Sequence, residues 1–122
     1  MANTLYAVYV NNTNNQMGTY KTTDGGTTWT TLAALPTNLC NNQCWYNLYI
    51  EIAPDGSIWE GGFGIHRSTD DGVTWSIVTN GIHVDQHAVA FGPGGTTWAG
   101  NDGGLYTTTT NGGAWTSRNA NL

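Results

Sequence analysis

The feature that most limits how this 122-residue chain can fold is an internal repeat. The segment DGGTTW at residues 24–29 recurs as DDGVTW at residues 70–75, which places Trp29 and Trp75 46 residues apart. A weaker third copy ends at Trp115, 40 residues further on. Periods of roughly 20–50 residues indicate solenoids, propellers or related arrays. We therefore expect a repeat architecture.

A second register supports the same period. The segment IAPDGSIW at residues 52–59 matches FGPGGTTW at residues 91–98 with a constant offset of 39. Turn-forming centres flanked by β-type residues predict a hairpin in each copy. Residues 3–6 correspond to residues 56–59, so the first unit is expected to begin at the hairpin turn and to lack its first strand. The 17 glycines and three Lys and Arg residues also argue against long helices.

These registers predict eleven strands in three units. The first unit should contribute strands near 4–10, 17–23 and 27–33. The second should contribute strands near 46–53, 57–62, 64–69 and 73–79, and the third near 85–91, 96–100, 104–109 and 114–118. The predicted fold class is all-β.

The repeated turns resemble the Asp-box, or bacterial neuraminidase, repeat family, whose pattern is Ser/Thr-x-Asp-x-Gly-x-Thr-Trp. Two copies match at every position: Thr22, Asp24, Gly26, Thr28, Trp29 and Ser68, Asp70, Gly72, Thr74, Trp75. The third keeps Gly112 and Trp115 but has Thr110 at the Asp position and Ala114 at the Thr position. A slip of one residue would let Asn111 replace the Asp.

The resemblance implies a sialidase-like β-propeller in which each unit is one blade. Blade one would span 3–35, blade two 45–80 and blade three 84–119, giving one three-stranded and two four-stranded blades. It also implies that the motif lies on the outer turn of each blade, away from any active site. Its Asp residues are expected to be structural, because turn Asp side chains usually bond to nearby backbone.

Three blades do not close a ring, since propellers typically need about 4–8. We expect a homo-oligomer, with a dimer giving six blades as the simplest solution and a ring of three copies as the next. The alternative is that the chain is a piece of a longer propeller.

Composition limits the partners. Only 9% of residues are charged and the net charge is −5, so nucleic acid and membranes are not expected as partners. The chain is expected to be soluble and its parent protein secreted, with no signal peptide at residues 1–4. No cofactor is predicted. Exposed tryptophan can stack on sugars, and Trp45, outside the repeated turns, is the candidate for glycan contact.

Glycoside hydrolysis needs two facing carboxylates. Outside the turns, the acidic candidates are Glu51, Glu60, Asp85 and Asp102. A sialidase would also require three arginines by family resemblance, and the chain has only Arg67 and Arg118. We therefore expect a non-catalytic module that self-assembles and acts as a scaffold or binds carbohydrate or protein. A partial glycoside hydrolase, completed across subunits or by further blades, is the alternative.

Two local groups have alternative interpretations. Alternation along a strand would place His83, Asp85 and His87 on one face, where neighbouring members could share a metal ion or form a hydrogen-bonded polar cluster. We favour the polar cluster. Cys40 and Cys44 could form a small disulfide or remain two thiols.

Overall fold

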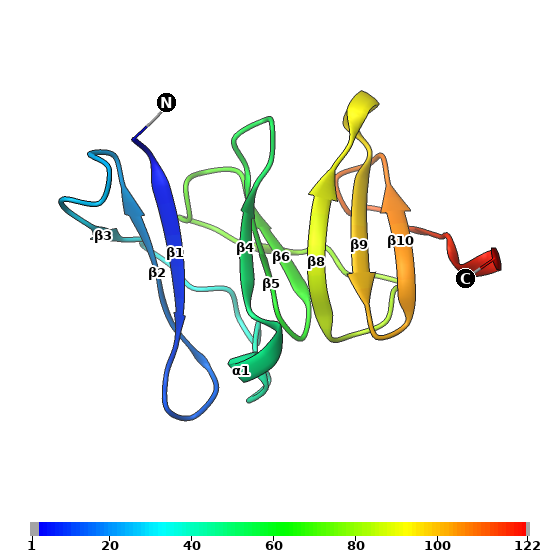
Figure 1. Cartoon of the computed structure of the whole chain (residues 1–122), viewed down its shortest axis with the longest axis horizontal. Coiled ribbons are helices and arrows are strands. Elements are labelled where there is room, and N and C mark those ends of the chain that lie inside the picture. The colour runs from blue at the N-terminus through cyan, green and yellow to red at the C-terminus, as the bar shows by residue number, and fades with distance from the viewer. Residues whose placement is uncertain (1–2, 122) are drawn as a thin grey trace.

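Eleven strands form three antiparallel sheets in the computed structural model, which describes residues 3–121. The sheets have three, four and four strands and lie side by side in chain order (Figure 1). Each is a meander, because hydrogen-bonded neighbours are consecutive in the chain. The prediction of an all-β chain with eleven strands in groups of three, four and four is confirmed for these residues, but residues 46–47, expected in a strand, lie in a short helix.

The first sheet has three strands, as the repeat register predicts. They are β1 (Leu5–Val10), β2 (Gln16–Thr22) and β3 (Thr30–Thr31). The strand order β1-β2-β3 leaves β1 at an edge of the sheet. Each of the other two sheets contains four strands.

The second and third sheets have matching strand orders. The second contains β4 (Tyr49–Ile52), β5 (Ile58–Gly61), β6 (Ile65–Ser68) and β7 (Ser76–Ile77). The third contains β8 (Gln86–Phe91), β9 (Thr97–Asn101), β10 (Gly104–Thr108) and β11 (Thr116–Ser117). The helical elements are α1 (Cys44–Asn47) and the 3-10 turns η1 (Pro93–Gly95) and η2 (Asn119–Asn121). None of the helices in residues 3–121 is long and apolar enough to cross a membrane.

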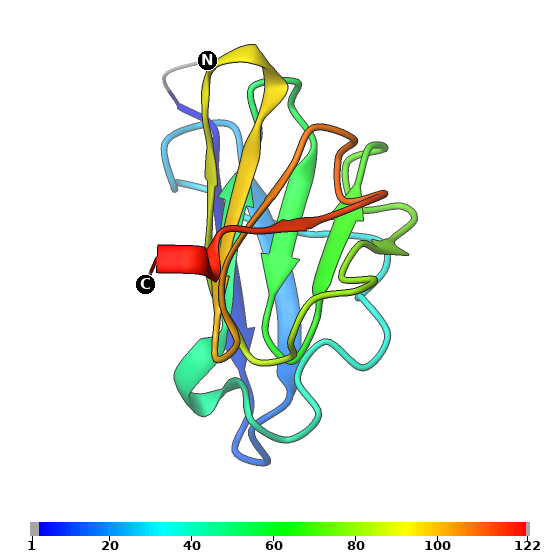
Figure 2. The same cartoon turned by 90° about the vertical axis from the view of Figure 1, so that its right-hand side faces the viewer.

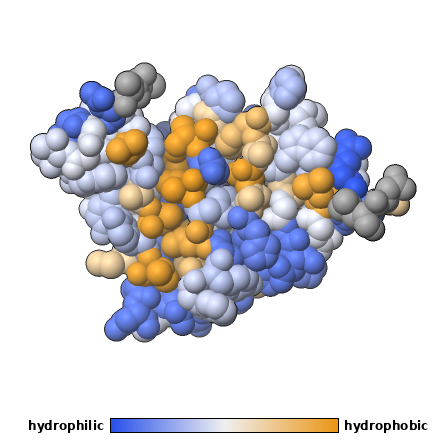
Figure 3. Space-filling model, in the orientation of Figure 1, coloured by the Kyte–Doolittle hydropathy of each residue, from blue (hydrophilic) through white to orange (hydrophobic). Residues whose placement is uncertain are grey.

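The sheets are stacked in a row, and the second sheet lies between the other two. Strand β4 contacts both β1 and β8, and the view along the row in Figure 2 shows the strands of the three sheets behind one another. Figure 3 shows apolar side chains gathered on the face that carries β1 and β4.

The two junctions between sheets differ in chemistry. Between the second and third sheets, Trp59 packs edge-on against Phe91, with ring centroids 5.6 Å apart, beside Ile65 and Val89. Burial of such side chains supplies the main favourable free energy of this junction. The junction between the first and second sheets contains polar contacts, including those of the buried carboxyl of Glu60.

Three turns carry the repeated motif, at residues 22–29, 68–75 and 108–115; we call them the repeat turns. In the second, Asp70 Oδ1 accepts the Thr74 N–H at 2.8 Å and Oδ2 accepts the Thr74 hydroxyl at 2.6 Å. The Ser68 hydroxyl donates to Asp70 at 2.8 Å and accepts the Gly72 N–H at 2.9 Å. These hydrogen bonds lower the pKa of Asp70, as the equivalent bonds do for Asp24.

The third repeat turn keeps the same geometry without an aspartate. The Thr110 hydroxyl accepts the Ala114 N–H at 2.9 Å, and Thr108 accepts the Gly112 N–H at 3.2 Å. Asn111 has φ 53°, close to the φ 57° of Asp71 at the same position of the second turn. Thr110 therefore takes the Asp position in register, and the one-residue slip to Asn111 does not occur.

Each of the last two repeat turns contacts the segment that follows the last strand of the preceding sheet. The Trp75 indole N–H donates to the Ala34 carbonyl at 3.0 Å, and the Trp115 indole N–H donates to the Val78 carbonyl at 2.7 Å. A Cβ added to Gly72 would lie 2.5 Å from Leu32 Cδ1, so only glycine permits this approach. The repeat turns thus join neighbouring sheets.

Substituting the repeat-turn glycines tests how much the close approach of Gly72 to Leu32 contributes to stability. Gly72→Ala and Gly26→Ala both place a side chain at positive φ, which costs about 1 kcal/mol. Only Gly72→Ala also meets a neighbouring sheet, because a Cβ on Gly26 lies no closer than 3.8 Å to another side chain. We expect Gly72→Ala to lose about 1–3 kcal/mol more unfolding free energy than Gly26→Ala.

Urea unfolding at submicromolar chain concentration would measure both variants without contributions from association. Equal losses in the two variants would show that the close approach of Gly72 to Leu32 contributes nothing to stability.

Candidate functional site

One end of the molecule, which we call the α1 end, gathers loops from all three sheets. It consists of the turns at residues 11–15, 62–64 and 102–103 and the loops at residues 33–48 and 79–85, at the bottom of Figure 1. A series of backbone hydrogen bonds joins them: Phe63 N–H to the Leu39 carbonyl at 2.6 Å, Asp85 N–H to Phe63 at 3.0 Å and Asp102 N–H to Asp85 at 3.3 Å. Side chains on different sheets are therefore held in fixed relation.

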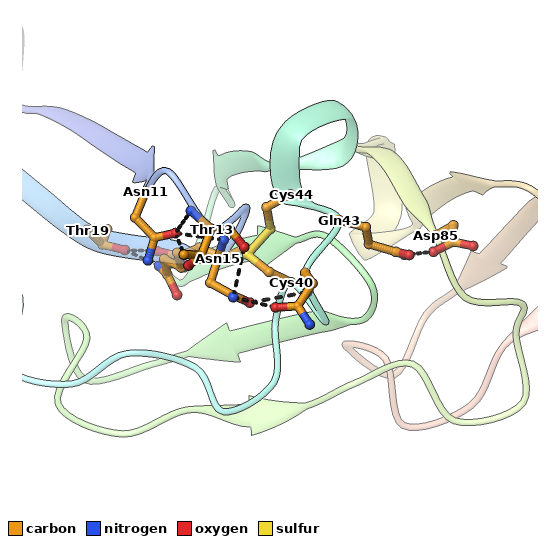
Figure 4. The surroundings of a disulfide bond; sticks show 11 residues. Asn11, Thr13, Asn15, Thr19, Cys40, Gln43, Cys44 and Asp85 are labelled. Carbon is orange, nitrogen blue, oxygen red and sulfur yellow. Dashed lines mark hydrogen bonds between the residues drawn. A yellow bond between two sulfur atoms is a disulfide. The ribbon is translucent and has the colours of Figure 1, made fainter.

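The loop before α1 is held by a disulfide between Cys40 and Cys44, so of the two interpretations of these cysteines the structure has the disulfide. Both cysteines are buried and pack with Leu39. Asn15 of the first sheet and Asn42 bond to each other, the Asn15 side-chain amide donating to Asn42 Oδ1 at 2.6 Å (Figure 4). The loop before α1 is thus fastened to the turn between β1 and β2.

An exposed aromatic pair lies on α1. Trp45 and Tyr46 have ring centroids 4.8 Å apart and are 68% and 42% exposed. Tyr46 also lies 5.7 Å from the ring of His87 in β8. Trp45 was the expected ligand contact; sequence reasoning missed Tyr46, although its adjacency to Trp45 was the available signal.

Two carboxylates lie beside this aromatic pair. Asp85 accepts a hydrogen bond from the Gln43 side-chain amide, which points toward it in Figure 4. Asp102 pairs with His87 at 2.6 Å. Burial, followed by the negative charges of Asp85 and Asp102, raises the pKa of Tyr46. The α1 end therefore combines aromatic rings with hydrogen-bond acceptors on a negatively charged surface.

His83, Asp85 and His87 do not share one face of a strand. Strand β8 begins at Gln86, and Asp85 has φ 62°, which interrupts the expected alternation. His83 Nδ1 lies 2.9 Å from the Val84 carbonyl oxygen, whereas His87 pairs with Asp102. Within residues 3–121, no group of three or more His, Cys, Asp or Glu side chains is placed to hold a metal ion.

Buried amides organise this part of the chain. The Asn101 side chain donates to the His83 carbonyl at 3.1 Å and to Gln86 Oε1 at 3.2 Å. Gln86 is fully buried and also donates to the His83 carbonyl. Sequence reasoning did not single out Asn101 or Gln86, because isolated amides carry no pattern before the fold brings them together.

The other two acidic candidates lie away from the aromatic pair. Glu51 is on β4 with an exposed side chain. Glu60 is buried between the first and second sheets, where its carboxyl accepts hydrogen bonds from Gln16, at 2.6 Å, and from the Thr19 hydroxyl. Burial raises the pKa of Glu60 to about 7, against the lowering effect of these hydrogen bonds. Its position between sheets is that of a structural group.

Glu60 makes the stability of the chain depend on pH. The folded state retains a proton on Glu60 that the unfolded state releases above about pH 4.5, so stability falls as pH rises from there to about 7 and then levels off. Glu60→Gln removes this loss, and the Gln16 amide can reverse to pair with it because Gln16 Oε1 has no partner. Above pH 7 we expect the unfolding free energy of the variant to exceed that of the parent by on the order of 3 kcal/mol.

Urea unfolding between pH 5 and 8.5 measures this difference. The neighbouring His66 is present in both proteins, so its own titration cancels to first order. A difference that stays constant across this range would contradict a raised pKa at Glu60.

Comparison with known proteins adds no family to this description. No protein-family model matches the sequence, and no curated protein matches it significantly.

Proposed function

We propose that the three sheets are consecutive blades of an Asp-box β-propeller, and that the chain is a non-catalytic module that binds carbohydrate. Copies of the chain complete the ring, with a dimer supplying six blades. The matching strand orders of the second and third sheets, the contacts of β4 with β1 and β8, and the contacts of the last two repeat turns with the preceding units support the blade assignment.

The exposed pair Trp45 and Tyr46 carries the binding part of the proposal. An aromatic ring offers a flat apolar face on which the C–H face of a pyranose can stack. Such a ring binds well when it is already fixed, since less conformational entropy is lost. The disulfide at Cys44 and the bond between Asn15 and Asn42 fix α1 in this way.

The charges beside the aromatic pair favour a neutral glycan. The carboxylates of Asp85 and Asp102 can accept hydrogen bonds from sugar hydroxyls. The same charges repel uronic and sialic acids, and Arg67, on β6, is paired with Asp55 at 2.8 Å. A neutral oligosaccharide is the chemical class we propose.

The hydrogen bonds and the burial of the carboxylates favour binding over hydrolysis. Asp85 is bonded to Gln43 and Asp102 to His87, and Glu60, whose raised pKa would suit a general acid, is buried between sheets. The glycoside hydrolase alternative would rest on Asp85 and Asp102.

Titration calorimetry with cellohexaose tests the proposal. We expect saturable binding that Trp45→Ala weakens by up to about tenfold, because aromatic contacts of this kind contribute about 0.5–1.5 kcal/mol. Sialyllactose should give no saturable signal. Val73→Ala is the matched control, since Val73 is also highly exposed but lies on the second repeat turn.

Equal affinity of the parent and Trp45→Ala for cellohexaose would refute a site at α1. Release of shorter sugars from cellohexaose, abolished in Asp85→Asn, would instead support the hydrolase alternative.

A further inference from the structure

Within residues 3–121, no sheet contacts the repeat turn of the first sheet in the way that the other two repeat turns are contacted. Trp75 and Trp115 both donate their indole N–H to the sheet before them. Trp29, at the same motif position, donates to the Gly26 carbonyl of its own turn at 3.1 Å and is 44% exposed. Trp29 therefore lacks the contact that the other two tryptophans make.

The third sheet has the complementary surface. Leu32, Val78 and Arg118 are equivalent, because each donates its backbone N–H to the same position of the neighbouring strand: Thr19 at 2.9 Å, Ile65 at 2.9 Å and Leu105 at 2.8 Å. Leu32 and Val78 are buried by the repeat-turn glycine of the following sheet. Arg118 is exposed, and no following glycine covers it within the described residues.

The tryptophans of the repeated hairpin show the same difference. Trp59 is 1% exposed and packs against Phe91 of the following sheet. Trp98, 39 residues later at the matching position, is 38% exposed. On the third sheet Trp98 and Arg118 are thus exposed, whereas the matching residues of the second sheet, Trp59 and Val78, are covered by the third sheet.

The exposed face of the first sheet is apolar and hollowed. Tyr9, Met17, Tyr20 and Trp29 line a shallow hollow of about 340 Å³. Tyr9 packs edge-on against Tyr20, with centroids 5.6 Å apart, and Met17 is more than half exposed. Apolar side chains grouped in this way mark an interaction surface.

We infer that a second copy of this chain docks head to tail, the first-sheet face of one copy against the third-sheet face of the other. The inference rests on the blade assignment of the proposed function and continues an interface that the chain already makes twice. Gly26 of one copy would approach Arg118 of the other, as Gly72 approaches Leu32.

The chemistry of the two faces is complementary. The aliphatic stem of Arg118 can cover Gly26, and its guanidinium can lie over the Trp29 ring. Trp98 can fill the hollow beside Tyr9 and Met17, as an aromatic anchor in an apolar pocket. Because the two faces differ, the contact is heterologous, and two such contacts close a ring of two copies.

Sedimentation equilibrium at 1–100 μM chain tests the inference. We expect twice the 13.1 kDa mass of one chain. Met17→Lys and Trp98→Lys should each raise the dimer dissociation constant at least tenfold, because each places a charge in an apolar contact. Val73→Lys, also at a highly exposed position, should leave the mass unchanged.

Mixing the two variants separates head-to-tail docking from contact between identical faces. An equimolar mixture of Met17→Lys and Trp98→Lys retains one intact pair of faces, so heterodimer should reappear where each variant alone is monomeric. Circular dichroism and thermal unfolding confirm that each variant is folded.

A parent chain that stays monomeric at 100 μM would overturn the inference, as would a mixture that stays monomeric. Loss of dimer in Met17→Lys alone, with Trp98→Lys unaffected, would indicate contact between identical faces and would also overturn it. Cellohexaose binding by a monomeric parent would leave the binding proposal standing while this inference fails.

Discussion

The contact between a repeat turn and the preceding sheet is the interaction on which the architecture depends. It combines an indole N–H bonded to a backbone carbonyl, as in Trp75 to Ala34, with a glycine that lets the two sheets approach closely. The hydrogen bond fixes one point of contact and the glycine sets the spacing of the two sheets. The aspartate or threonine inside the turn acts one step earlier: it closes the turn that holds the tryptophan in place. The chain therefore stacks as successive units, each positioned by its neighbour.

This arrangement explains why the two junctions can differ so much. The junction of the second and third sheets is closed by Trp59 and Phe91, whereas the junction of the first and second contains the buried carboxyl of Glu60. A buried carboxyl is tolerated there because Gln16 and Thr19 bond to it and because it can remain protonated. Since the repeat turn sets the spacing at both junctions, the side chains between the sheets are free to vary.

The strands were predictable because the hairpin offset of 39 and the turn motif each fix a register, and two registers together leave little freedom for β-strands. The third repeat turn was harder, since Thr110 replaces the aspartate with a hydroxyl that accepts the same backbone N–H. The start of β8 was predicted one residue early because no sequence pattern indicates the positive φ of Asp85. The site was predictable only in part: Trp45 is conspicuous, but Gln43 and Tyr46 acquire their role from contacts with Asp85 and His87, which the fold brings from the third sheet.

The spacing of the repeats also indicates where a binding surface can arise. The first two turn tryptophans are 46 residues apart and the last two are 40, and the longer interval contains the loop that carries the disulfide and α1. Residues in the repeated strands and turns are constrained by the sheets on either side. Binding residues are therefore more easily placed in a loop inserted between repeats. The disulfide and the bond between Asn15 and Asn42 supply order that the repeat does not provide in this loop. The aromatic pair on α1, for which we propose a role in binding, thus stands on the segment that lengthens the first interval.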